Sequence, residues 1–109
     1  MLTKGFNHVA VITADMDRLK EFYTSVFGAE VLRDGPEGPP DAKVRMAIIK
    51  VGPYSELNVF QVPGNSQAGH QTPMFGRGRL DHMALEAESI EAFEEARERL
   101  IALGDARRV

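Results

Sequence analysis

Residues 6–13 read Phe-Asn-His-Val-Ala-Val-Ile-Thr, a run rich in β-branched side chains. Such a run favours a strand, and Asp15 just after it favours the start of a helix. From Asp15 to Gly28 apolar residues recur every three or four positions, which predicts one apolar helix face and a helix that ends at the glycine. The chain is therefore expected to begin with a buried strand followed by an amphipathic helix.

Three more strands are predicted before residue 63. We expect a short strand at 30–33 and then a loop at 34–41, because three prolines and two glycines in that stretch cannot supply a regular ladder of hydrogen bonds. Two further strands are expected near 43–51 and 55–62, on either side of a Gly-Pro turn. The predicted order is βαβββ, and the Gly-, Pro- and Gln-rich residues 63–78 are interpreted as a linker.

The pattern begins again after this linker. Leu80-Asp-His-Met-Ala-Leu85 matches the first strand at an offset of 74 residues, and the same offset aligns the apolar positions of a second helix with those of the first. Ser89 is the predicted N-cap of that helix and Gly104 its predicted end. The sequence therefore predicts an internal duplication whose second copy supplies a strand and a helix.

The duplication also predicts the domain organisation. We expect a single domain over residues 1–109, with a first module at 1–62, the linker at 63–78 and a partial second module at 79–109. The offset places the last three strands of the second copy beyond Val109. The fold class is therefore predicted as α+β, a βαβββ module followed by the β-α start of a second module that is incomplete at its C-terminal end.

Composition excludes several classes of function. A formal net charge of −3 with interspersed signs offers no basic stripe for nucleic acid. The absence of cysteine excludes disulfides and thiolate ligands, so any metal would be held by nitrogen and oxygen. No signal peptide and no membrane-spanning run is evident, and the protein is expected to be cytoplasmic and not bound to membranes.

His8 and His82 carry the strongest chemical signal, because they occupy equivalent positions in the two copies of one strand. If the copies pack with pseudo-two-fold symmetry, the two imidazoles converge. Glu56 on the fourth strand is a third candidate ligand, although a solvated strand-edge residue is the alternative interpretation. Asn58 lies two residues further on the same face, where a register error would replace Glu56 by a poor ligand. Two histidines and a carboxylate suit Zn, Ni, Fe(II), Mn or Co.

Several of these segments together resemble the vicinal oxygen chelate superfamily, the glyoxalase/bleomycin-resistance/dioxygenase group. The resemblance covers nearly the whole chain and is carried by Phe6-Asn-His-Val-Ala-Val11, Phe22-Tyr-Thr-Ser-Val-Phe-Gly28, Glu56-Leu-Asn-Val-Phe-Gln61 and Leu80-Asp-His-Met-Ala-Leu85. It implies paired βαβββ modules whose sheets curve around a cleft. It also implies a ligand from the first and last strand of each module, here His8, Glu56 and His82, with the fourth position beyond Val109.

The resemblance implies a metal-dependent lyase, isomerase or dioxygenase. Its substrate is a small molecule with two adjacent oxygens that chelate the cation, and Glu56 is a ligand or a base. One alternative is a non-catalytic binding module of the bleomycin-resistance type, which needs no metal. Another is an inactive, truncated chain. A homodimer is also expected, because two first modules related by a two-fold axis would bring together His8 and Glu56 from both chains.

Overall fold

The computed structural model describes residues 1–68 and 82–104. The chain divides into two compact units, Met1–Gly69 and His70–Val109, and each is described here by itself. The first unit contains β1 (His8–Ile12), α1 (Met16–Phe27), β2 (Glu30–Glu37), the short 3₁₀ helix η1 (Pro40–Ala42), β3 (Val44–Gly52) and β4 (Ser55–Gln61). This is the predicted βαβββ order, and with α2 (Ile90–Ala102) in the second unit it confirms the α+β class.

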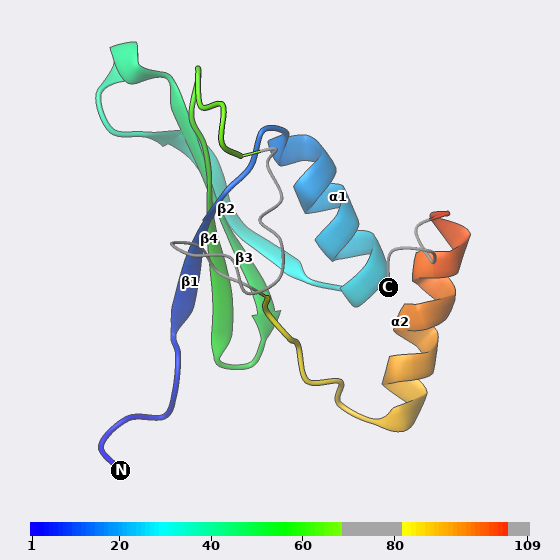
Figure 1. Ribbon diagram of the computed structural model, residues 1–109. Coiled ribbons are helices and arrows are strands. Elements are labelled where there is room, and N and C mark those ends of the chain that lie inside the picture. Colours follow the sequence, from blue (N-terminus) through cyan, green and yellow to red (C-terminus); the bar gives the residue numbers. More distant parts are fainter. Residues whose placement is uncertain (69–81, 105–109) are drawn as a thin grey trace. The chain divides into compact units, whose positions relative to one another are not determined.

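The four strands form one sheet in the order β1-β4-β3-β2, with α1 on one of its faces (Figure 1). β1 runs parallel to β4, whereas β3 is antiparallel to both of its neighbours. The parallel pair joins the first and last strands of the unit, and it brings the start of the chain against residues almost 50 positions later, with His8 opposite Glu56. The sheet therefore has two edge strands, β1 and β2.

α1 forms because its two ends are capped and one of its faces is apolar. The Asp15 side chain accepts a hydrogen bond from the Arg18 backbone N–H (3.1 Å), and Gly28 ends the helix at φ 66°, where a Cβ would be strained. Met16 on this helix is fully buried against the sheet. The core residues, none more than 2 % exposed, are Met16, Ala47, Ile49, Leu57 and Val59. This core cluster thus lies between α1 and one face of the sheet.

The predicted loop at 34–41 is wrong in its first half, because β2 continues through Gly35 and Pro36 to Glu37. Pro36 is paired with Arg45 and Glu37 with Val44 on β3. β2 is an edge strand, so half of its backbone N–H groups have no sheet partner, and a proline there need not remove a ladder hydrogen bond. Only after Glu37 does the chain leave the sheet, to form η1 at Pro40–Ala42.

In the second unit the predicted helix is present and the predicted strand is not observed. The Ser89 hydroxyl accepts a hydrogen bond from the Ala92 N–H (3.0 Å), and Gly104 follows the helix at φ 78°, which confirms the predicted cap and end. Residues 82–87 have no regular secondary structure, while Leu80 and Asp81 lie outside the described residues. In the first unit β1 is paired with β4, and the described part of the second unit supplies no strand for such pairing.

An ion-pair network joins α1 to β2 and β3 on the helix side of the sheet. Arg45 donates two hydrogen bonds to the Asp34 carboxylate (2.8 and 2.7 Å) and one to Asp17 (2.8 Å), and Lys20 also donates to Asp34. The guanidinium of Arg45, together with Lys20, holds the pKa of Asp34 well below its usual range. The network therefore links α1 to the β2 edge of the sheet.

Asp34→Asn is expected to lower the free energy of unfolding by about 1 kcal/mol at pH 7, because it removes the shared acceptor of a partly exposed network. The folded-state pKa of Asp34 is depressed, so its stabilising contribution is present above the usual aspartate pKa of about 3.9 and is lost as the pH falls below it. In urea unfolding, the gap between wild type and variant should narrow steadily as the pH falls below about 4. Glu37→Gln is the control, since its exposed ion pair with Arg33 should contribute almost nothing.

None of the helices in the described part of the chain has the length and apolar character needed to cross a bilayer.

Candidate functional site

One row of polar and charged residues crosses the sheet at a single level. His8 on β1 is paired with Glu56 on β4, Glu56 with Lys50 on β3, and Lys50 with Glu30 on β2. Neighbouring strands lie about 4.8 Å apart, and residues directly opposite each other project from the same face. The four side chains are therefore neighbours in the order His8, Glu56, Lys50, Glu30.

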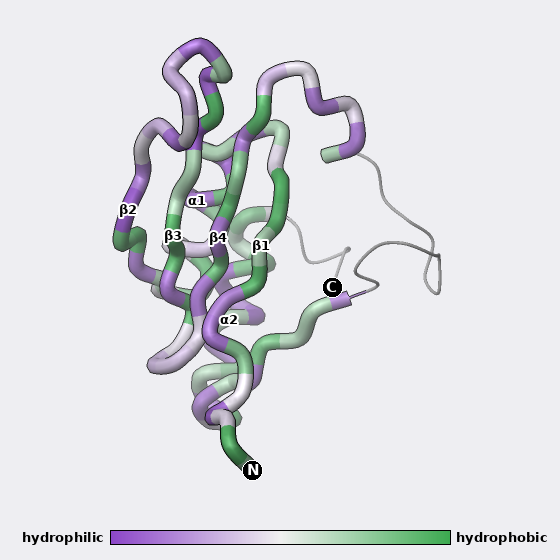
Figure 2. The backbone as a smooth tube through the Cα atoms, turned by 90° about the vertical axis from the view of Figure 1, so that its left-hand side faces the viewer, coloured by the Kyte–Doolittle hydropathy of each residue, from purple (hydrophilic) through white to green (hydrophobic). Residues whose placement is uncertain are grey.

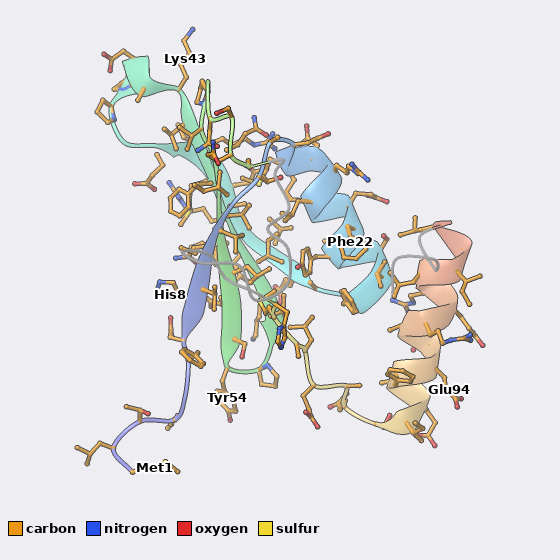
Figure 3. All side chains as sticks on the ribbon, viewed as in Figure 1. Met1, His8, Phe22, Lys43, Tyr54 and Glu94 are labelled. Carbon is orange, nitrogen blue, oxygen red and sulfur yellow. The ribbon has the colours of Figure 1, made fainter. Side chains whose placement is uncertain are left out.

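The row lies on the face that α1 leaves open. Ile49 and Leu57 are buried against the helix, and side chains alternate along a strand, so Lys50 and Glu56 project to the other side. Figure 3 shows His8 projecting from β1 on the side of the sheet away from α1. Figure 2 views the same unit from that side, with α1 behind the sheet. Within the first unit, the face that bears His8 and Glu56 is thus not the face that forms the core.

A backbone hydrogen bond fixes the register beside His8, and a side-chain hydrogen bond orients its ring. The Glu56 N–H donates to the Asn7 carbonyl oxygen (3.1 Å), which holds β4 beside the start of β1. The Asn7 Oδ1 lies 2.8 Å from His8 Nδ1. Because a carboxamide oxygen only accepts, Nδ1 is the donor in this contact, and Nε2 lies on the other side of the ring. This is the arrangement in which an imidazole binds a metal through one nitrogen and is oriented through the other.

The open face becomes apolar further along the strands. One level above the row, Ala10 is paired with Asn58 and Asn58 with Ile48; at the next, Ile12 is paired with Phe60 and Phe60 with Met46. Ile12 is 49 % exposed, whereas Met46 is 8 % exposed. A ligand at the His8 level would therefore have an apolar surface beside it.

The structure brings two of the three predicted ligands together. Glu56, and not Asn58, is the residue opposite His8. His82 is an exposed residue of the second unit, in the irregular stretch 82–87. Within the part of the chain that the structure describes, no group of three or more His, Asp or Glu side chains is arranged to hold a metal ion. His8 and Glu56 are therefore two candidate donors side by side, a candidate half-site that would need further ligands to bind a cation firmly.

The sequence did not single out Asn7 or Lys50. A signal for Asn7 was available, since a residue with a side-chain oxygen precedes the histidine in both copies, Asn7 before His8 and Asp81 before His82. Lys50 had no such signal. It neighbours Glu56 only because of the register between β3 and β4, and the two residues belong to different strands of a hairpin.

Comparison with known proteins shows the family and the fold of the chain. The family model described as Glyoxalase/Bleomycin resistance protein/Dioxygenase superfamily matches residues 5–106. A glyoxylase/bleomycin resistance protein/dioxygenase domain from Frankia sp. EAN1pec is 20 % identical with a TM-score of 0.75, covering 94 % of this chain and 75 % of that one. A glyoxalase family protein from Enterococcus faecalis is 27 % identical with a TM-score of 0.69, covering 95 % and 75 %.

A third solved structure includes bound ligands. It is a variant of the fosfomycin resistance protein FosX from Listeria monocytogenes in complex with Mn(II) and 1S,2S-dihydroxypropylphosphonic acid. It is 16 % identical with a TM-score of 0.66, covering 94 % of this chain and 71 % of that one, so the likeness extends to the fold alone. No curated protein sequence matches the chain.

Proposed function

The chain belongs to the glyoxalase/bleomycin resistance protein/dioxygenase superfamily, and from this premise we propose that it is a metal-dependent enzyme acting on a small molecule with two adjacent oxygens. His8, Glu56 and His82 are the proposed metal ligands, and Glu56 is also the proposed catalytic base. The reaction is a lyase, isomerase or dioxygenase reaction. The cytoplasm is its proposed compartment, and neither nucleic acid nor membrane is a proposed partner.

The observation that carries this proposal is the pairing of His8 with Glu56 across β1 and β4 on the open face of the sheet. An imidazole that is oriented through Nδ1 and a carboxylate one strand away are a nitrogen and an oxygen donor, a set that suits Zn, Ni, Fe(II), Mn or Co. The FosX relative holds Mn(II), which makes Mn(II) a suitable first probe. The donor set therefore fits a divalent cation of this group.

When bound, such a cation would act as a Lewis acid on oxygens that chelate it. The chain's own residues would orient the metal ligand, accept a proton and exclude water. The hydrogen bond from His8 Nδ1 to Asn7 orients the imidazole, and the Glu56 carboxylate is placed beside it to accept a proton from the carbon next to the substrate oxygens. The apolar side chains of Ile48 and Phe60 would lie along the body of the substrate and exclude water from it.

The proposal is tested by metal content and oligomeric mass, measured after purification of the whole chain with Zn, Ni, Mn or Fe(II) supplied. Roughly stoichiometric metal supports the proposal. A chain that retains none of these metals contradicts it and leaves the non-catalytic binding module, in which the same face holds a small molecule without metal, as the better account.

The remaining ligands can come from two sources, and the proposed domain organisation favours the first. If 1–62 and 79–109 are two modules of one domain joined by the linker 63–78, His82 completes the site within the chain. If two copies pair as the proposed homodimer, His8 and Glu56 of the second copy complete it.

His82→Ala separates these two sources. With an intrachain site, the variant is expected to bind Mn(II) about 100-fold or more weakly in isothermal titration, because a ligand is lost and not an outer-shell partner. Unchanged affinity together with a dimeric mass would instead assign the missing ligands to the second copy. Glu88→Gln, in the same unit and outside the proposed ligand set, is the matched control.

A further inference from the structure

The open face of the first sheet carries two cations, Arg33 and Lys50, and they differ in their partners. The Arg33 guanidinium donates to the Glu37 carboxylate (3.0 Å) and to the Pro36 carbonyl oxygen (2.9 Å). Lys50 is flanked in register by Glu56 and Glu30, yet among the described residues no carboxylate lies within ion-pair distance of its ammonium. Of these two cations, Lys50 is therefore the one without an ion pair to a carboxylate among the described residues.

We propose that Lys50 binds an anionic group of the substrate, such as a carboxylate, while the adjacent oxygens of the same molecule bind at His8 and Glu56; this rests on the function proposed above. The substrate class is thereby narrowed to anions. Lys50 is a specificity-determining residue and takes no part in proton transfer.

Distance supports this assignment. Lys50 and Glu56 are direct partners on antiparallel strands, so their Cβ atoms are about 5 Å apart. The lysine side chain has a flexible four-carbon stem and three donors at its tip. Its ammonium can therefore reach a group that lies a few ångströms from a ligand held at Glu56, without any movement of the sheet.

Charge supports it as well. Without Lys50, the carboxylates of Glu30 and Glu56 would be the only charged neighbours at this level and would repel an anion. Lys50 lies between these two carboxylates in the row, and its positive charge offsets part of their repulsion. With a divalent cation at His8 and Glu56, this row has a net positive charge and complements a ligand that has a negative group beside its chelating oxygens.

Two probes that share one pair of adjacent oxygens test the proposal: catechol and 3,4-dihydroxybenzoate, which adds a carboxylate. Their affinities are measured by isothermal titration on the Zn(II)-loaded whole chain, after removal of unbound metal. The ratio of the two dissociation constants is the readout, because it cancels effects on the metal itself. Lys50→Met is expected to reduce the preference for the carboxylate probe by about threefold to tenfold relative to wild type.

Two further variants serve as controls, one for the charge at position 50 and one for the loss of a lysine elsewhere. Lys50→Arg keeps the positive charge and should keep most of the preference. Lys43→Met removes a lysine at the opposite end of β3 (Figure 3) and should leave the ratio unchanged. An unchanged ratio in Lys50→Met, on a metal-loaded chain, overturns the role of Lys50 alone. A wild-type chain that retains none of Zn, Ni, Mn and Fe(II) overturns the proposed function and this role with it.

Discussion

His8→Ala is expected to weaken Mn(II) binding by about 100-fold or more, measured by isothermal titration on the whole chain. The imidazole is the proposed nitrogen donor opposite Glu56, and its loss would leave Glu56 as the only proposed ligand from the first unit. The loss is expected in the intrachain model and in the homodimer, because His8 belongs to the site in both. Loss of a ligand should cost more than the tenfold to 100-fold that follows the loss of an outer-shell partner.

Glu56→Gln and Glu30→Gln form the matched pair for this prediction. Both glutamates lie in the same row and both flank Lys50, but only Glu56 is opposite His8. Glu56→Gln should weaken Mn(II) binding strongly, and Glu30→Gln should leave it almost unchanged. Asn7→Ala, which removes the partner of His8 Nδ1, should fall between them with a loss of about tenfold. Equal affinities in His8→Ala and wild type would contradict the assignment of the half-site.

Local patterns in the sequence predicted most of the fold of the first unit. The apolar spacing from Asp15 to Gly28 gave α1 with its two caps, since periodicity and capping depend on residues close together in the chain. The extension of β2 through Pro36 was not predictable in this way. Whether a proline is tolerated depends on whether its strand lies at the edge of the sheet, and this is a property of the strand order.

In the candidate site, too, local patterns were predictable from the sequence and the pairing of distant strands was not. The repeat in the sequence selected His8, and Glu56 was a candidate as a carboxylate on the fourth strand, with Asn58 on the same face as the alternative. The register between β1 and β4 decides that Glu56, and not Asn58, is opposite His8. This register depends on how the almost 50 residues between His8 and Glu56 fold. Lys50 enters the row for the same reason. The strand predicted at 80–85 is not observed in its described residues 82–85; a similar stretch forms a strand only where another strand accepts its hydrogen bonds.

Ile49→Ala is expected to lower the free energy of unfolding by about 3 to 4 kcal/mol, whereas Ile48→Ala should cost about 1 kcal/mol. The two isoleucines are adjacent on β3 and chemically identical. Ile49 is 0 % exposed beneath α1, and Ile48 faces the open side with partial exposure. The truncation of Ile49 leaves a cavity in the core, while the space left by Ile48 is open to water. Urea unfolding of both variants measures the difference.

This pair tests the orientation on which the whole site depends. Side chains alternate along a strand. A larger loss of unfolding free energy in Ile48→Ala than in Ile49→Ala would therefore mean that Lys50, Glu56 and His8 face α1, and the proposed open metal half-site would not exist. If Ile49→Ala does not fold, Ile49→Val and Ile48→Val give the same comparison at about 1 kcal/mol and near zero. Mn(II) binding by Ile49→Val should equal that of wild type, because the shortened side chain lies on the opposite face from His8 and Glu56.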